Sequence, residues 1–254
     1  MDLGLEPAVL AEKLQGPRPL VRVGHGLYAP PRPGSTVAWA AWVYVPPALR
    51  RRGHGAQALA ALEARAQADG ATRLRLGGPP GNYCVPGVPV DDPALPEALS
   101  RRGYRPGPES VDLIVNPTDH RGFVHAALRR GEAHDLAWIA AEFSTSWAEE
   151  CARALRTGGV WVTEGADGSP EGFVAWGGNL ASRGRFGPVG VVARARGRGH
   201  GAVLTRAALG ALADEGFATV TVPWVAAETV GFYAAFGPVL SMRRHVVWEK
   251  GLGG

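Results

Sequence analysis

Hydrophobic and polar positions along the 254-residue chain follow two periods that alternate from one segment to the next. Short runs rich in valine, alanine and tryptophan, bounded by glycine and proline, are typical of β-strands. Longer runs rich in alanine, leucine, glutamate and glutamine, which tend to end at a glycine, are typical of α-helices. This alternation predicts an α/β (α+β) architecture in which helices flank a mixed central β-sheet.

In the first half, no helix is expected before the first strand. Strands and helices follow in alternation, with strands predicted at 19–29, 36–45, 72–76 and 111–115 and helices at 55–69 and 92–101. The stretch 77–90 is rich in glycine and proline and is predicted to be an ordered, turn-rich segment. We place the boundary after it, at 116–121, which divides the chain into domains 1–116 and 117–254.

The second half has the same alternation but begins with helix. A helical pattern covers 134–156 with a break at 144–146, and further helices are predicted at 200–215 and 227–236. The intervening apolar runs predict strands at 160–163, 172–176, 187–193, 218–222 and 242–248.

A glycine-arginine loop occurs once in each half, in the same setting. Its copies read Arg50-Arg51-Arg52-Gly53-His54-Gly55 and Arg196-Gly197-Arg198-Gly199-His200-Gly201, and one constant offset aligns them without a gap. Each copy follows a strand-like run and opens a helix-like run. The first N–H groups of a helix lack intrahelical partners and the helix dipole is positive there, so such a loop can hold phosphate. The repeat therefore predicts a phosphate-bearing cofactor.

The charge and cysteine content narrow the range of partners. The formal net charge is +4, and Lys13 and Lys250 are the only lysines, so the positive charge is carried mainly by arginine. Because arginines concentrate in the two loops, discrete phosphates are favoured over nucleic acid. The two cysteines are far apart and lack metal-ligand spacing, so no metal is expected. No apolar run is long enough to span a membrane, and a cytoplasmic protein without a membrane partner is expected.

The loop and a downstream segment resemble the GCN5-related N-acetyltransferases (GNAT). Both loops match the family's Arg/Gln-x-x-Gly-x-Gly/Ala pattern, which holds the pyrophosphate of an acyl-CoA. In the second half, 226–237 is similar to the family's Asn-x-x-Ala-x-x-Phe-Tyr-x-x-x-Gly segment and places Tyr233 on its general acid. The resemblance implies two tandem GNAT-like domains, of which the first is truncated at its start.

Three departures from the family pattern bear on function. Ala226 replaces the family's asparagine, which removes a polar contact to pantetheine, and Pro238 follows Gly237 in place of an aromatic residue. In the first half, Leu99 stands where the tyrosine would be, and leucine has no proton to donate. We therefore expect a degenerate N-terminal domain and a catalytic C-terminal domain. The first loop remains a second candidate cofactor site, formed by Arg50, Arg51, Arg52, Gly53, His54 and Gly55.

The resemblance also implies roles for individual residues. Acetyl-CoA would be the donor, Tyr233 would protonate the departing thiolate, and a backbone N–H of the strand before the loop would polarise the thioester carbonyl. Glu142, Glu171, Glu228 and water are equal candidates for the general base. The candidate cofactor-binding residues are Val191, Val192, Ala193, Arg196, Gly197, Arg198, Gly199, His200, Gly201 and Ala202.

The leading hypothesis is an N-acetyltransferase that moves an acetyl group directly to a primary amine, such as an amino sugar or other small amine. A mycothiol-synthase-like acyltransferase is an alternative, although that family's asparagine-containing stretch is absent. The third hypothesis is a non-catalytic CoA-binding or sensor module, in which Tyr233 is only a core aromatic residue. A homodimer is left open.

Overall fold

The computed structural model of the protein describes residues 3–15, 18–91 and 94–253. These residues form two compact units. The N-terminal unit comprises Met1–Ser110 together with Arg244–Gly254, and the C-terminal unit comprises Val111–Arg243. The end of the chain is therefore part of the first unit.

This division differs from the expected halves, 1–116 and 117–254, at both edges. Two long strands, β6 (Arg105–Val115) and β12 (Val239–Gly251), each begin in one unit and end in the other. The last residues of β12 pair with β4 (Arg73–Leu76) from the first half. Turn-rich composition predicted the boundary, but composition carries no information about which distant strands pair, and pairing decides the division.

The N-terminal unit is a mixed sheet with helices on both faces. Its strands follow the order β1-β2-β3-β4-β12-β6, and β5 pairs with β12 beside this path. The β3–β4 pair is parallel, and the β1–β2, β2–β3 and β4–β12 pairs are antiparallel. The remaining elements are α1 (Pro7–Leu14), β1 (Val21–Val23), β2 (Gly26–Ala29), β3 (Val37–Val43), the 3₁₀ turn η1 (Pro47–Leu49), α2 (His54–Ala68), β5 (Val88–Pro89) and α3 (Ala94–Arg101).

Alternation along β4 shows how the faces of this sheet are used. Leu74 and Leu76 are buried in the core beneath α2 and α3. Arg73 and Arg75 point to the opposite face, because successive side chains of a strand alternate. On that face Trp39 and Val247 belong to a second core, which also contains Leu3 at the start of the described chain.

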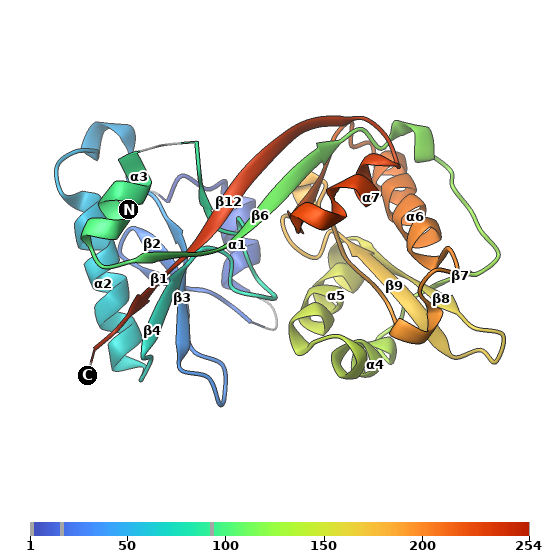
Figure 1. Ribbon diagram of the computed structural model, residues 1–254, viewed down its shortest axis with the longest axis horizontal. Coiled ribbons are helices and arrows are strands. Elements are labelled where there is room, and N and C mark those ends of the chain that lie inside the picture. Colours follow the sequence, from blue (N-terminus) through green and yellow to red (C-terminus); the bar gives the residue numbers. More distant parts are fainter. Residues whose placement is uncertain (1–2, 16–17, 92–93, 254) are drawn as a thin grey trace. The chain divides into compact units, whose positions relative to one another are not determined.

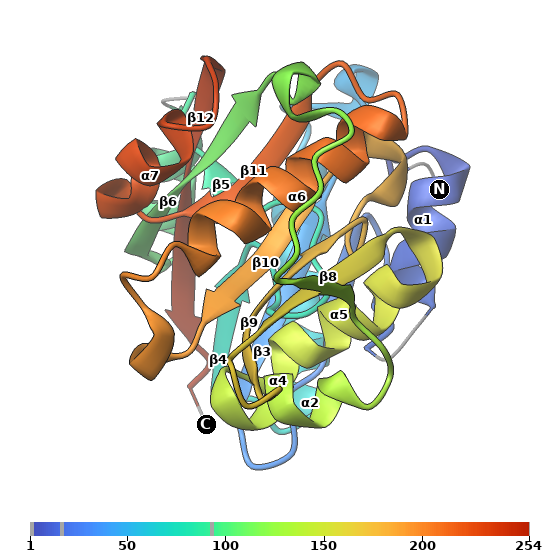
Figure 2. The same ribbon diagram turned by 90° about the vertical axis from the view of Figure 1, so that its right-hand side faces the viewer.

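The C-terminal unit contains an antiparallel sheet in the order β10-β9-β8-β7. The helices α4 and α5 cover one face and α6 covers the other, as Figures 1 and 2 show. The elements are η2 (Thr118–His120), β7 (Leu128–Arg130), α4 (Asp135–Glu142), α5 (Thr145–Thr157), β8 (Gly159–Glu164), β9 (Pro170–Trp176), η3 (Ala181–Arg183), β10 (Phe186–Val191), η4 (Ala193–Ala195), α6 (His200–Asp214), β11 (Val220–Val225), η5 (Ala227–Thr229) and α7 (Val230–Ala234).

The strands β10 and β11 meet at one end only. A single parallel bridge joins Arg185, just before β10, to Thr221 in β11, and the Thr221 N–H donates to the Gly184 carbonyl. Beyond this point β11 pairs with β6 and β10 pairs with β9. Within the described residues, β10 therefore has one edge free of strand partners from Phe186 to Val191.

Several predicted elements differ from those observed. The expected first strand is the hairpin β1–β2, which turns at Gly24 with a positive φ of 54°. The expected long helix is two helices, because the Ser144 hydroxyl accepts the Trp147 N–H and caps α5. The sequence analysis missed α1, β5 and β7, which are too short for a clear period. Positions 92–93 of the expected helix at 92–101 lie outside the described residues.

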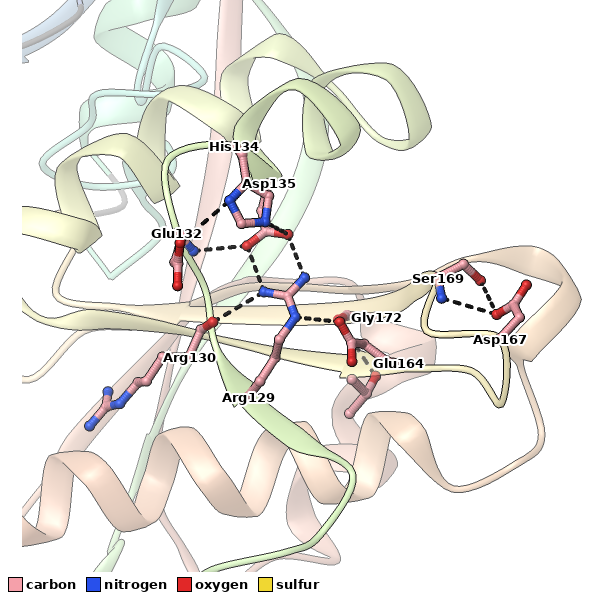
Figure 3. A network of polar contacts seen from close by, with 10 residues as sticks. Arg129, Arg130, Glu132, His134, Asp135, Glu164, Asp167, Ser169 and Gly172 are labelled. Atoms are coloured by element: carbon pink, nitrogen blue, oxygen red, sulfur yellow. Dashed lines mark hydrogen bonds and ion pairs between the residues drawn. The ribbon is translucent and has the colours of Figure 1, made fainter.

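A polar network fixes the short edge strand β7. The Arg129 guanidinium donates to both carboxylate oxygens of Asp135, at 2.9 and 2.7 Å, and to Glu164, as Figure 3 shows. Burial alone would raise the pKa of Asp135, but the Arg129 hydrogen bonds outweigh it and leave this pKa below its usual value. The network holds the start of α4 against the sheet, and it occupies both carboxylates.

Candidate active site

The second glycine-arginine loop lies between the end of β10 and the start of α6. Gly197 and Gly199 have positive φ angles of 76° and 88°, a region that is costly for residues with a Cβ. Gly199 is the N-cap of α6, and no side chain caps this helix end. The Ala202 N–H donates to the Gly199 carbonyl at 3.0 Å, and the N–H groups of His200 and Gly201 are left for an external acceptor, as anion binding requires.

The two arginines of this loop have different roles. The Nε–H of Arg196 donates to the Val191 carbonyl at 3.1 Å and ties the loop back to the strand before it. Arg198 is exposed, and no ion pair or hydrogen bond joins its side chain to another described residue. Arg198 is therefore the freer of the two cations for an incoming phosphate, while Arg196 supports the shape of the loop.

His200 lies beside a carboxylate that the sequence analysis treated only as a candidate base. Its Nε2 is 3.1 Å from the Glu171 carboxylate oxygen, and both side chains are largely buried. Glu171 belongs to β9, so this contact links the first residue of α6 to the neighbouring strand. The spacing between residues 171 and 200 gave no sign of it.

The direction in which each backbone N–H group of β10 points decides which of them could polarise a thioester carbonyl. The Val192 N–H already donates to the Glu171 carbonyl at 2.9 Å, so it is not free to polarise a thioester. Because N–H groups alternate in direction along a strand, Val189 and Val191 direct theirs to the open edge. Ala193 lies outside the strand in η4. The sequence analysis missed Val189, which counting back from the loop in steps of two would have found.

Tyr233 lies on α7 against the other end of β10. Its ring packs edge-on against Phe186, with centroids 5.8 Å apart, and against Phe232 at 5.1 Å. Among the described residues, the Tyr233 hydroxyl has no hydrogen-bond partner. Burial raises the pKa of Tyr233 to about 12, so the hydroxyl keeps its proton at neutral pH.

Phe232, the neighbour of Tyr233, faces the loop end of the site. A Cβ added to Gly201 would lie 3.6 Å from the Phe232 ring and 4.0 Å from Val191. Since the Phe232 and Tyr233 rings are only 5.1 Å apart, the pair links the loop region at Gly201 to Phe186 at the start of β10.

The candidate bases separate by position. Glu171, on β9, lies beside His200 at the loop end of the site. Glu142, at the end of α4, is exposed, and so is Glu228, in the turn η5 that precedes α7. Ala226 and Pro238, the departures from the family motif, flank the segment that contains Glu228 and Tyr233. Of the three carboxylates, only Glu228 comes from the segment that carries Tyr233.

The first loop has the same backbone form as the second. Arg51 and Gly53 have positive φ angles of 60° and 84°, matching Gly197 and Gly199. The Arg50 Nε–H donates to the Val45 carbonyl at 3.0 Å, as Arg196 does to Val191. The resemblance between the two copies therefore extends from sequence to conformation.

The surroundings of the first loop differ from those of the second. His54 faces the ring of His25, with centroids 6.1 Å apart, where His200 faces a carboxylate. Leu99 is buried in the apolar core, and the nearby Tyr104 hydroxyl donates to Glu63 at 2.9 Å. The described part of this unit has no hydroxyl in the place that Tyr233 occupies.

Comparisons with known proteins agree with this geometry. The family model described as "Acetyltransferase (GNAT) family" matches residues 20–83, which include the first loop. A tandem GNAT protein from the clavulanic acid biosynthesis pathway superposes over 100% of this chain and 90% of its own, with a TM-score of 0.72 and 18% identity. No curated protein matches the sequence.

Two further structures have the same fold. A GCN5-related N-acetyltransferase from Kribbella flavida is 20% identical, with a TM-score of 0.63, and the match covers 97% of this chain and 95% of that one. The GCN5-related glucosamine N-acetyltransferase region of a fungal multi-domain GH3 β-N-acetylglucosaminidase is 19% identical, with a TM-score of 0.67. That match covers 91% of this chain but only 31% of the fungal protein.

Two α/β units, each with a glycine loop between a sheet strand and a helix, define a tandem acetyltransferase fold. Residues 20–83 match the acetyltransferase (GNAT) family model, and the chain as a whole has the fold of a tandem GNAT protein. One short helix, α1, precedes β1 in the first copy, and the truncation expected at its start stays a prediction.

Three further observations concern metals, membranes and thiols. In the described ranges, no group of three or more His, Cys, Asp or Glu side chains could hold a metal ion. None of the described helices is both long enough and apolar enough to cross a bilayer. Cys84 and Cys151 are buried and form no disulfide, and burial raises the pKa of Cys151, which opposes a nucleophilic role.

Proposed function

We propose that the protein is an acetyl-CoA-dependent N-acetyltransferase whose active site lies in the C-terminal unit. The observation that supports this most is the placement of two groups along β10. The phosphate-type loop follows the end of the strand, and Tyr233, whose hydroxyl has no partner among the described residues, packs its ring against Phe186 at the start of the strand. Between them, the open edge of β10 presents backbone N–H groups to an extended ligand.

In this proposal the loop holds the CoA pyrophosphate. The N–H groups of His200 and Gly201 at the start of α6 and the exposed Arg198 supply the positive potential. Arg196 preserves the loop shape through Val191. The pantetheine arm lies along β10, and Gly201 lets it pass Phe232 without a side chain in the way.

The chemistry is then a direct transfer. The neutral amine of the acceptor attacks the thioester carbonyl, and the oxygen becomes negative in the tetrahedral intermediate. The Val189 N–H, on the open edge of β10 near Tyr233, is the donor best placed to stabilise that oxygen. Collapse breaks the C–S bond, Tyr233 supplies a proton to the sulfur, and the amine gives up its proton to water or to Glu228.

The acceptor in this proposal is a small primary amine. The fungal region with the same fold is described as a glucosamine N-acetyltransferase. Glucosamine is therefore the first acceptor to test, although the match covers only 31% of that protein. Other primary amines follow it in the same assay.

The test is release of CoA from acetyl-CoA, measured over a panel of primary amines that includes glucosamine. Loss of the hydroxyl in Tyr233→Phe should lower kcat by about 10²- to 10⁴-fold. The affinity for acetyl-CoA should be unchanged, because the hydroxyl acts only on the departing sulfur. Tyr44→Phe, in the N-terminal unit, is the matched control and should leave kcat unchanged.

Two results would contradict the proposal. Unchanged turnover in Tyr233→Phe would exclude this hydroxyl as the proton donor. Acetyl-CoA binding without turnover of any amine in the panel would favour the sensor hypothesis, in which Tyr233 only packs against Phe186 and Phe232.

A further inference from the structure

The N-terminal unit contains a cavity that the proposed transfer reaction does not use. It has a volume of about 490 Å³ and lies over the sheet face opposite α2 and α3. Its lining includes Arg73 and Arg75 from β4, Glu249 and Val247 from β12, and Arg105 from β6. Cavities of a few hundred cubic ångströms are the usual size for small-molecule sites.

The cavity is strongly positive. Three arginines and one glutamate are the charged residues of its lining, which leaves a net charge of +2. Arg105 is exposed, and among the described residues its guanidinium has no ion-pair or hydrogen-bond partner. The sequence analysis assigned the arginines of this protein to the two loops, so this cluster was not anticipated.

The positions of Arg73 and Arg75 are set by the fold. Both lie on β4 at alternate positions, and their side chains share the Glu249 carboxylate at 3.7 and 2.6 Å. Arg75 also stacks on Trp39, with the guanidinium carbon 5.5 Å from the ring centroid. Glu249 shows that a carboxylate fits between Arg73 and Arg75. Its single negative charge neutralises only one of the three arginines that line the cavity.

Glycines keep the rest of the cavity open. A Cβ built at Gly251 would meet nothing within 4 Å, and one at Gly103 would meet only the end of the Lys250 side chain, at 3.9 Å. Both positions line the cavity. A ligand can thus approach the backbone there without displacing a side chain.

We propose that this cavity binds a small dianion, a dicarboxylate or a phosphate, by means of Arg73, Arg75 and Arg105. The guanidinium fork pairs two parallel N–H groups with carboxylate or phosphate oxygens. Arg75, stacked on Trp39 and paired to Glu249, is preorganised. Arg105 supplies the charge that has no partner in the protein. A dianion matches the net charge of +2 and leaves the site neutral.

The experiment is a calorimetric titration of the full chain, first with succinate and then with inorganic phosphate. Arg105→Gln removes the unpartnered cation and should weaken binding about tenfold, the effect of one charge-assisted hydrogen bond. Glu249→Gln removes the resident carboxylate and should tighten binding. Arg101→Gln, which alters an exposed pair on α3, is the matched control and should have no effect.

The two probes distinguish the sources of the anion. Phosphate can also bind at the glycine loops. That binding is the same in wild type and in Arg105→Gln, so the difference between the two titrations reports the cavity alone. Preference for succinate assigns the cavity to a dicarboxylate, and preference for phosphate assigns it to a phosphoryl compound. Absence of saturable binding, or binding that neither Arg105→Gln nor Glu249→Gln alters, would overturn the proposal.

Discussion

The two glycine-arginine loops have nearly the same backbone and very different surroundings. Both use left-handed residues at corresponding positions, and both tie their first arginine to the backbone carbonyl five residues earlier. Beyond that they diverge: His200 meets Glu171, whereas His54 meets His25. Conservation of a loop between two copies therefore preserves a shape that can hold phosphate, and the neighbouring elements decide whether chemistry can follow.

The tyrosines of the two units show the same contrast. The Tyr233 hydroxyl has no partner among the residues described, whereas the Tyr104 hydroxyl donates to Glu63, which also binds Lys250 at 2.8 Å. Because Lys250 lies on β12, this cluster ties the end of the chain to α2. One tyrosine is left available for a substrate, and the other serves stability.

The largest effect on cofactor binding should come from adding a methyl group at the helix N-cap of each loop. Gly199→Ala and Gly53→Ala force alanine into φ angles of 88° and 84°, where a Cβ meets nothing within 4 Å in the protein. Both should lose about 1 kcal/mol of stability from the left-handed backbone. Only Gly199→Ala should weaken acetyl-CoA binding, by about tenfold or more, because its Cβ occupies the approach to the phosphate.

Thermal unfolding gives the stability change of both variants, and calorimetry gives their affinity for acetyl-CoA. Equal loss of affinity in the two variants would mean that both loops hold cofactor. Loss in Gly53→Ala alone would move the donor site to the N-terminal unit, where the family model matches.

The next effect concerns the cluster that ties β12 to α2. In Glu63→Gln the carboxylate loses its charged partners Lys250 and Arg102, and the free energy of unfolding should fall by about 2 kcal/mol. Glu97→Gln breaks an exposed pair with Arg101 and is the control, with an expected loss of under about 0.5 kcal/mol. Urea unfolding of both variants measures the difference.

This effect should depend on pH in a defined direction. Burial alone would raise the pKa of Glu63, but the hydrogen bonds from Lys250 and Tyr104 prevail and hold it below its ordinary value. A lowered pKa gives stability that is fully present above the unfolded-state value of about 4.3 and is lost as the pH falls through the folded-state value. The difference between wild type and Glu63→Gln should thus be constant near neutrality and shrink below about pH 4. A difference that grew on acidification would refute this account.

The smallest effect concerns the one residue that strains the first loop. Arg51 has a φ of 60°, where the second loop has Gly197. Arg51→Gly removes the left-handed strain of about 1 kcal/mol, and the greater freedom of glycine in the unfolded chain offsets part of the gain. A thermal melt should show stabilisation of less than about 1 kcal/mol. A clear loss of stability would mean that the Arg51 side chain makes a contact worth more than its strain.

Local patterns allowed much of this architecture to be predicted from the sequence. The two loops, the helices that follow them and the break at Ser144 all depend on neighbouring residues, and each was anticipated. The α/β alternation was confirmed, and the fold is that of a tandem GNAT protein, as the resemblance implied. Glycine at 199 and 53 signalled a backbone that few other residues adopt.

Long-range pairing accounts for what the sequence did not show. The crossing of β6 and β12 between the units, the contact of His200 with Glu171 and the arginines around Glu249 all join residues distant in the chain. Val189 was missed because its proposed role depends on which edge of β10 has no partner strand. That edge is open because β11 pairs with β6 and not with β10.

The most direct test of the central claim is a calorimetric titration of the wild-type protein with acetyl-CoA, which gives affinity and stoichiometry together. The account predicts saturable binding at one site per chain, with an affinity that is weakened about tenfold or more in Gly199→Ala and unchanged in Gly53→Ala. Absence of binding, or a single site whose affinity Gly199→Ala leaves unchanged, would contradict a donor site at the loop of the C-terminal unit.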